Sequence, residues 1–280
     1  MTEQQRTYPP GVTCWINTDQ PDVDAALEFY GGLFGWTFHD VMPADAPRRY
    51  VVGQLGGRDA AAVAGPRERG ESREAAWNTY IAVDDVDATT ERLVSLGATV
   101  VSPPAEAGRG GRTSVLTDPE GAEFRLWRAR GMLGAQVANQ PGAWNFSDLH
   151  TADPDAAADF YGRAFGWSLD DLGYATAIRV PGYGDHLEST IDPDIRTRQA
   201  SAPDGFEDVI GSFGPLVDGE APHWHVTFTV ADRDEAASSV ERLGGTVLSS
   251  GDDDWTRHAL VRDPAGARFT ISQFAPVEWD

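Results

Sequence analysis

Histidines suited to acid–base chemistry gather in the second half of this 280-residue chain. Of the six histidines, five follow residue 143: His150, His186, His223, His225 and His258. His223 and His225 lie two positions apart, so a regular strand would place both side chains on one face. A histidine of near-neutral pKa opposite a carboxylate such as Asp148 is suited to general acid or base catalysis. We favour the structural alternative, in which one histidine of this pair belongs to the core or rim and the other is incidental.

The run Asp254-Trp-Thr-Arg-His258 adds a cation and an aromatic ring before the last turn of the sequence. Arg257 could pair with an anionic or phenolic oxygen of a ligand. The alternative is a surface ion pair with a neighbouring aspartate, which would stabilise little. His225, Asp148 and Arg257 are therefore the candidate catalytic residues.

The composition excludes several kinds of site. The net charge is −22 and the chain has no lysine, which argues against a nucleic-acid partner and excludes a Schiff base. Cys14 is the single cysteine, so intrachain disulfides and cysteine-rich zinc sites are excluded. No apolar run resembles a signal peptide or is long enough to span a membrane. We expect a cytoplasmic protein with no membrane partner.

The elements that must position these residues follow from a repeat. Residues 22–36 and 153–167 both contain Phe-Tyr-Gly and end in Phe-Gly-Trp, 131 positions apart. Each predicts a short amphipathic helix, with an aspartate as its N-cap and a glycine as its end. Trp36 and Trp167 are expected to pack between helix and strand.

A second, shorter repeat completes the pattern. Helices are predicted at 85–96 and 232–243, and an Asp-Pro-x-Gly turn at 118–121 and 263–266 precedes each closing strand. Each half of the chain therefore reads as two βαβββ modules, which predicts an α+β fold with two tandem domains. The expected organisation is a disordered tail at 1–10, a domain at 11–128, a linker at 129–142 and a second domain at 143–275.

The second domain carries extra residues. The offset between the repeats grows from 131 at Tyr30 and Tyr161 to 147 at Trp77 and Trp224. We place the insertion at about 193–222, with a helix at 193–199. Long insertions often cover a binding site, so this one is a candidate lid.

The order of these motifs, with Phe-Tyr and Phe-Gly-Trp in the first helix of each pair, resembles the vicinal oxygen chelate superfamily. That superfamily includes glyoxalase I, bleomycin-resistance proteins and extradiol dioxygenases. Pro181-Gly-Tyr-Gly184, the insertion and Pro222-His-Trp-His-Val226 resemble an actinobacterial subgroup with two tandem domains. In the superfamily, paired modules curl into a cup that holds a ligand or a metal, so the resemblance implies two cup-shaped mixed sheets.

The resemblance also implies where a metal would be held. The ligand positions of the metal-dependent members fall on Trp15, Asn78 and Arg125 in the first domain, and on Phe146, His225 and Thr270 in the second. Only His225 is a metal ligand by type, with Glu188 or His186 as candidate helpers, whereas a metal site normally has three or four protein ligands. We expect no metal or other cofactor in either cup, with a divalent metal as the alternative.

Aromatic side chains take the place of the missing ligands. The candidate ligand-binding residues are Trp15, Asn17, Asn78, Tyr80, Arg125, Trp144, Phe146, His223, Trp255 and Thr270. Such a lining suits a planar apolar ligand that stacks on rings and is oriented by hydrogen bonds. The alternative is that the rings only fill the cups as core. The second domain is the better candidate because it carries the insertion and Arg257.

These features favour a glyoxalase- and bleomycin-resistance-like protein, a monomer or homodimer, that binds a small aromatic molecule of antibiotic or polyketide type without a metal. One alternative is a metal-independent tailoring enzyme of secondary metabolism: a cyclase, an isomerase or a hydroxylase partner. Two others are a metal-dependent lyase or dioxygenase, and a scaffold protein with filled cups.

Overall fold

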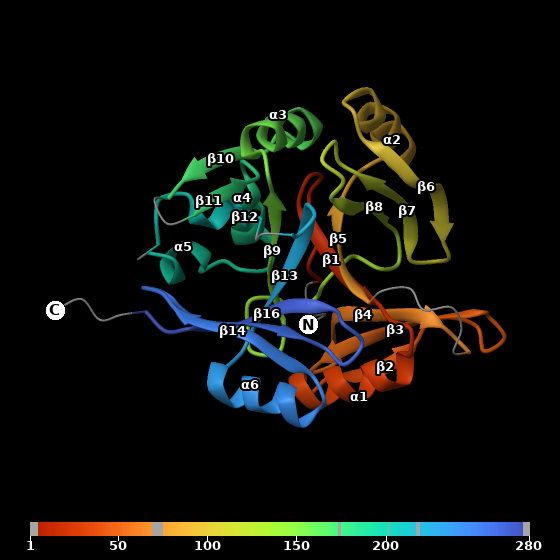
Figure 1. The fold of residues 1–280 in the computed structure, drawn as a ribbon. Coiled ribbons are helices and arrows are strands. Elements are labelled where there is room, and N and C mark those ends of the chain that lie inside the picture. The colour runs from red at the N-terminus through yellow and green to blue at the C-terminus, as the bar shows by residue number, and fades with distance from the viewer. Residues whose placement is uncertain (1–4, 69–74, 173–174, 201, 217–218, 277–280) are drawn as a thin grey trace. The chain divides into compact units, whose positions relative to one another are not determined.

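A computed structural model describes residues 5–68, 75–172, 175–200, 202–216 and 219–276 (Figure 1). In these residues, no helix combines the length and the apolar character that crossing a bilayer requires. The helices are α1 (Val23–Phe34), α2 (Val86–Ser95), α3 (Pro154–Phe165), α4 (Tyr183–Thr190), α5 (Ile195–Arg198) and α6 (Arg233–Arg242), with a 3-10 turn, η1, at Phe206–Asp208.

The strands form two eight-stranded sheets. The first sheet has the order β2-β3-β4-β1-β5-β8-β7-β6, from β1 (Thr13–Asp19), β2 (Thr37–Asp40), β3 (Arg48–Leu55), β4 (Arg58–Pro66), β5 (Ala76–Ala82), β6 (Thr99–Ala107), β7 (Gly111–Thr117) and β8 (Glu123–Ala129). The second has the order β10-β11-β12-β9-β13-β16-β15-β14, from β9 (Trp144–Thr151), β10 (Ser168–Asp171), β11 (Thr176–Arg179), β12 (Val209–Pro215), β13 (His223–Thr229), β14 (Thr246–Asp252), β15 (Thr256–Arg262) and β16 (Arg268–Phe274). The predicted α+β class with four βαβββ modules is confirmed.

The helix ends follow the predicted capping chemistry. The carboxylates of Asp22 and Asp153 accept hydrogen bonds from backbone N–H groups of the first turn, at 3.2 and 3.0 Å. Gly35 and Gly166 end their helices with φ of 71° and 72°, a conformation that glycine adopts without steric cost. These local signals place α1 and α3 at the expected residues.

The structure divides into two compact units, and each unit combines one module from each half of the sequence. One unit comprises residues 1–15, 79–134 and 147–224, and so joins the second module to the third. The other comprises residues 16–78, 135–146 and 225–280, and joins the first module to the fourth. In this second unit α1 and α6 lie side by side (Figure 1). The boundary between the units passes through β1, β5, β9 and β13, so each of these strands contributes to both.

The repeated sequence motifs meet inside these units. In one unit the Tyr161 hydroxyl donates to Asp118 Oδ2 at 3.0 Å and accepts from Trp224 Nε1 at 3.2 Å. In the other, the Tyr30 hydroxyl donates to Asp263 Oδ2 at 2.8 Å. The tyrosine of each Phe-Tyr motif therefore binds the aspartate of an Asp-Pro-x-Gly turn from the opposite repeat.

The two Phe-Gly-Trp tryptophans pack as expected. Trp36 and Trp167 are buried, and each indole N–H donates to a glycine carbonyl at 2.7 Å, of Gly142 and Gly11 respectively. Trp167 also stacks on Tyr161, with the ring centroids 4.9 Å apart. Each tryptophan, which directly follows the glycine that ends its helix, is thus held by burial and by a hydrogen bond.

The extra residues of the second domain lie earlier than the sequence offset suggested. β3 and β4 are joined by a two-residue turn, whereas their counterparts β11 and β12 are separated by residues 180–208, which hold α4, α5 and η1. Residues 209–215 are a core strand that pairs with β9. An offset gives the length of an insertion but not its place, since flanking loops also change length.

Part of the expected N-terminal tail makes defined contacts. Residues 1–4 lie outside the described residues, but Arg6 Nη2 donates to the Tyr183 hydroxyl at 3.1 Å. Thr7 Oγ1 lies 3.2 Å from His186 Nε2, and the Arg6 guanidinium lies 5.5 Å from the ring centre of Tyr8. The segment from Arg6 to Tyr8 therefore anchors on the inserted helix α4.

Candidate functional site

Asp148 on β9 is held by the neighbouring strand β12. Its Oδ1 accepts hydrogen bonds from the backbone N–H and the hydroxyl of Ser212, at 2.9 and 2.8 Å. Burial raises the pKa of Asp148 to about 6, against the opposing effect of these two hydrogen bonds. A carboxyl group of this kind exchanges a proton near pH 6, and the catalytic role of Asp148 stays a prediction.

His150 and His223 form a close pair at the adjoining ends of β9 and β13. Their ring centres are 4.7 Å apart with an interplanar angle of 42°. Burial, together with the neighbouring imidazole of His223, lowers the pKa of His150 to about 4. Gly214, the register partner of His150 on β12, leaves room for the ring, because a Cβ there would lie 3.1 Å from it. The imidazole of His150 is therefore neutral at physiological pH.

His225 follows two residues after His223 on the same strand. His225 is buried, and its Nε2 lies 2.8 Å from the Thr270 hydroxyl. His223 Nδ1 lies 2.9 Å from the carbonyl oxygen of Ala221. The structure brings His225 into contact with Thr270, the two residues that the resemblance placed at ligand positions of the second domain.

β9 also carries the predicted aromatic residues of the second domain. Trp144 and Phe146 precede Asp148 and His150 at alternate positions, so these four residues share one face of the strand. Trp144 is only 3% exposed, and its indole N–H has no hydrogen-bond partner in the described part of the chain. A buried donor without a partner is costly.

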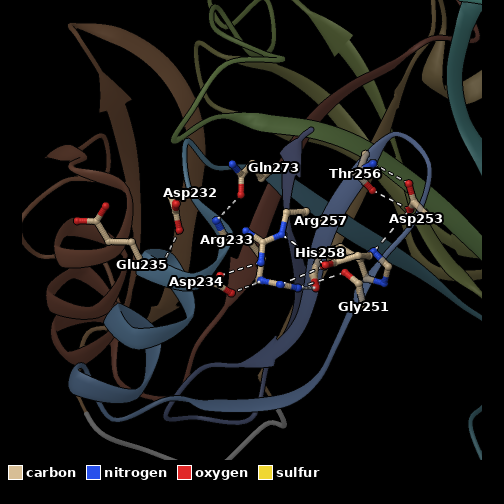
Figure 2. A network of polar contacts seen from close by, with 11 residues as sticks. Asp232, Arg233, Asp234, Glu235, Gly251, Asp253, Thr256, Arg257, His258 and Gln273 are labelled. Atoms are coloured by element: carbon tan, nitrogen blue, oxygen red, sulfur yellow. Dashed lines mark hydrogen bonds and ion pairs between the residues drawn. The ribbon is translucent and has the colours of Figure 1, made fainter. Parts of the chain in front are cut away.

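Arg257 lies in a network of charged side chains on β15 and α6 (Figure 2). Its guanidinium binds Asp234 at 2.8 Å and Asp252 at 3.5 Å. The centre of this network is Arg233, which binds Asp234 at 2.7 Å and donates to the carbonyl oxygen of His258 at 2.8 Å. Arg257 thus makes surface ion pairs in this structure, and its catalytic role stays a prediction.

Trp255, the other predicted residue of this region, belongs to the turn between β14 and β15. It is half-buried, and its backbone N–H donates to Asp253 Oδ1 at 2.8 Å. The contacts that hold it are therefore those of a turn.

The predicted residues of the first domain fall into two groups. Tyr80 and Arg125 are register partners, and Arg125 Nη1 donates to the Tyr80 hydroxyl at 3.0 Å while its guanidinium lies 5.4 Å from the ring centre. Asn78 donates to the carbonyl oxygen of Asn17 at 3.3 Å. Trp15 and Asn17 are fully buried. These side chains are more deeply enclosed than Phe146, Asp148 and His150 of the second domain, which are half-buried.

The residues at the metal-ligand positions of the superfamily do not fit a metal. Trp15, Phe146 and Arg125 offer no ligand atom, and Asn78 and Thr270 are weak donors by type. The proposed helpers are engaged elsewhere: Glu188 forms an ion pair with Arg196, and His186 contacts Thr7. At those positions only His225 is suitable, so no chemical step is derived through a metal held there.

Comparisons with known proteins agree with this architecture. A family model described as a glyoxalase-like domain matches residues 15–127 and 133–272. A protein named "Putative glyoxylase CFP32" from Mycobacterium bovis is 34% identical over 272 residues, covering 96% of this chain and 97% of that protein. The anthracycline biosynthesis protein DnrV of Streptomyces peucetius is 32% identical over 277 residues, or 94% of each chain.

A solved structure shows the same fold at low sequence identity. The Mn(II)-bound glyoxalase from Novosphingobium aromaticivorans matches with a TM-score of 0.60 and 15% identity, over 97% of this chain and 85% of that one. The predicted resemblance is thereby confirmed in sequence and in fold. The chain belongs to the glyoxalase-like family of the vicinal oxygen chelate superfamily and carries two tandem copies of the domain.

Proposed function

We propose that this protein binds a small, largely aromatic molecule of polyketide type through its second domain, without a metal at the superfamily's ligand positions. The observation that carries the proposal is the face of β9, where two aromatic rings, a carboxyl group and an imidazole follow one another. Rings supply a stacking surface for a planar ligand, and the polar groups orient it through its hydroxyl or carbonyl oxygens. In this proposal the protein works in the cytoplasm, as a monomer or a homodimer.

Two further observations support an aromatic ligand. The buried indole N–H of Trp144 lacks a partner among the described residues, as does that of Trp77 in the first domain, whereas those of Trp36, Trp127, Trp167 and Trp224 all donate hydrogen bonds. The relative DnrV is named for anthracycline biosynthesis, and anthracyclines are planar aromatic polyketides. Both point to a ligand with fused rings and oxygen substituents.

The proposal is tested by binding. Purified full-length protein is titrated with a panel of hydroxylated anthraquinones and naphthacenequinones, with tryptophan fluorescence and calorimetry as readouts. We expect saturable one-site binding that weakens at least about tenfold in Trp144→Phe, because the variant cannot donate to the ligand. Asp171→Asn, on the exposed edge strand β10, serves as a control and keeps wild-type affinity. No binding across the panel by folded protein would refute the proposal.

A metal-independent tailoring enzyme is the second candidate, and Asp148 favours it. A carboxyl group that titrates near pH 6 and is oriented by Ser212 can take up a proton from a bound phenol or an enolisable carbon. Turnover of a bound polyketide that survives a chelator and is lost in Asp148→Asn would support catalysis. Binding that persists in Asp148→Asn, with no turnover by the wild type, would leave the protein a binder.

A further inference from the structure

The carboxyl group of Asp148 has one oxygen that the protein holds and one that it does not. We propose that Asp148 donates a hydrogen bond from Oδ2–H to a carbonyl oxygen of the ligand, that the protein therefore selects neutral aromatic quinones and ketones, and that Ser212 is the positioning residue of this donor. The inference rests on the proposed function, since the acceptor is the aromatic molecule proposed above. It deepens that function by naming the chemical group that is recognised.

Hydrogen bonding distinguishes the two carboxyl oxygens. Oδ1 accepts from the backbone N–H of Ser212 at 2.9 Å and from its hydroxyl at 2.8 Å. In the described part of the chain, Oδ2 accepts no hydrogen bond and the carboxyl group forms no ion pair. A protonated carboxyl group has one O–H donor. Because both donors of Ser212 are on Oδ1, the proton belongs on Oδ2, and the half-buried side chain leaves that oxygen accessible to a ligand.

The backbone explains why Ser212 reaches Asp148. Residue 211, which precedes it on β12, is a glycine, and a Cβ there would collide with the carbonyl oxygen of Ser147 on β9. The glycine therefore allows β12 to lie close against β9. The hydroxyl of Thr13 also donates to the carbonyl oxygen of Ile210, at 3.4 Å, which holds β12 from another strand. The position of Ser212 thus follows from a close approach of two backbones.

The surroundings of Asp148 favour its neutral form. β12 has no titratable side chain, and the other titratable residues of β9 and β13 are His150, His223 and His225. Burial lowers the pKa of His150 to about 4, so this neighbour along β9 is uncharged near neutral pH. Burial also raises the pKa of Asp148 to about 6, although the two hydrogen bonds from Ser212 oppose this. An acceptor on Oδ2 would stabilise the protonated form further.

A donor of this kind discriminates among the oxygens of aromatic ligands. A quinone or ketone oxygen has lone pairs and no hydrogen, so it is stabilised only by a donor. An ionised phenol or a carboxylate would instead lie beside a group that ionises near pH 6, in a chain whose net charge is −22, and both charges would repel it. The ligand class that fits is a neutral aromatic carbonyl compound.

The pH dependence of binding tests the inference. The probe is 1,4-naphthoquinone, which has two carbonyl oxygens and no hydroxyl, and its binding to the full-length protein is followed by quenching of tryptophan fluorescence. Because only protonated Asp148 donates, we expect the affinity to fall about tenfold between pH 5 and 7, and about tenfold again by pH 8. Saturable binding of equal affinity at pH 5 and 8 would overturn the inference and leave the proposed function standing. Binding of the hydroxylated panel without the quinone would do the same, whereas no binding of either would overturn both.

Variants attribute the pH profile to this carboxyl group. Asp148→Asn keeps a donor in place of Oδ2–H, so it should bind the quinone as the wild type does at pH 5 and lose no affinity at pH 8. Asp148→Leu should bind about tenfold more weakly at pH 5. Ser212→Ala removes a hydrogen bond that favours the charged form, and should move the midpoint of the profile upward by about one unit of pH. A merely structural role of Ser212 would weaken binding without moving the midpoint. Ser168→Ala, on the exposed edge strand β10, is the matched control and should keep the wild-type profile.

Infrared spectroscopy tests the protonation without any ligand. The difference spectrum between the wild type and Asp148→Asn should contain the carbonyl band of a protonated carboxyl group, and half of that band should be lost near pH 6. In Ser212→Ala the same loss should occur at higher pH. Thermal melts verify that each variant is folded. A band that is already lost at about pH 4, the range of an ordinary aspartate, would overturn the inference whatever the binding experiments give.

Discussion

Replacing Tyr161 with phenylalanine tests how the repeated motifs stabilise the protein. The substitution keeps the ring, which stacks on Trp167, and removes only the hydroxyl. That hydroxyl is fully buried and donates to Asp118 Oδ2 at 3.0 Å while it accepts from Trp224 Nε1 at 3.2 Å. Tyr161→Phe therefore deprives two buried groups of a partner at once.

The expected loss follows from what remains on Asp118. Its Oδ1 keeps three backbone hydrogen bonds, at 2.9–3.0 Å, so the carboxylate stays partly satisfied. Its Oδ2 loses the only hydrogen bond that it accepts from the described residues. A hydrogen bond to a charged group contributes about 1.5–3 kcal/mol, and the stranded indole N–H adds to the cost. We expect Tyr161→Phe to lower the free energy of unfolding by about 3 kcal/mol.

The other repeat supplies a matched comparison. Tyr30 donates to Asp263 Oδ2 at 2.8 Å, but the same oxygen also accepts from Gln20 Nε2 at 2.7 Å. Tyr30→Phe therefore leaves that oxygen with one donor and should cost only about 1–1.5 kcal/mol. The two pseudo-equivalent substitutions should differ by more than about 1 kcal/mol.

Urea denaturation followed by far-UV circular dichroism and tryptophan fluorescence measures both variants, and a slope common to them and the wild type allows the midpoints to be compared. The double variant Tyr161→Phe with Asp118→Asn should lose less than the sum of the single losses, since both changes break one interaction. Equal losses for Tyr161→Phe and Tyr30→Phe, or a Tyr161→Phe loss below about 0.5 kcal/mol, would refute the reasoning.

Three further predictions concern stability. Burial raises the pKa of Asp148 to about 6 from 3.8. The contribution of Asp148 to the stability of the protein is therefore complete below pH 3.8 and is lost as the pH rises through 6. In urea titrations with a chelator present, the free energy of unfolding of Asp148→Asn relative to wild type should rise by about 1 kcal/mol between pH 5 and 7. Gly211→Ala would press its Cβ on a backbone carbonyl of a neighbouring strand and should lower the free energy of unfolding by about 3 kcal/mol or more. Gly166→Ala, whose Cβ would meet open space, should lower it by only about 1–2 kcal/mol. Equal shifts in the thermal midpoints of the two variants would contradict this. Arg233→Met should lower the free energy of unfolding by about 2–3 kcal/mol, because the buried guanidinium of Arg233 binds two carbonyl oxygens. Arg196→Met, on the exposed insertion, should change the urea midpoint little. A larger loss for Arg196→Met than for Arg233→Met would refute this ranking.

The elements and their ends could be predicted because they depend on local chemistry. Asp22 and Asp153 cap helices, Gly35 and Gly166 end them, and the repeated Asp-Pro-x-Gly turns precede closing strands, all within a few residues of sequence. The pairing of modules could not be predicted in this way. The apolar face of α1 indicates that it must be buried, but not that α6 of the fourth module covers it.

The candidate site was predictable only in part. Alternation placed Asp148 on one face of its strand with the aromatic residues, and the resemblance placed His225 opposite Thr270, where the structure has them. The closeness of His150 and His223 was missed, since it depends on the register of two strands far apart in the chain. One signal in the sequence pointed to this pair. The alternation of side chains along the strand puts His150 on the same face as Asp148, and the neighbouring strand begins with His223.

The exchange of module partners has a consequence for any attempt to isolate one repeat. A fragment that ends at residue 128 would contain Tyr30 without Asp263 and Asp118 without Tyr161, so both of its modules would expose buried polar and aromatic surface. Such a fragment should be insoluble alone, or should dimerise, because a second copy offers the equivalent aspartate and tyrosine. Co-expression with residues 129–280 should restore the native fold by fragment complementation. The sequence repeat is therefore not the compact unit of the structure.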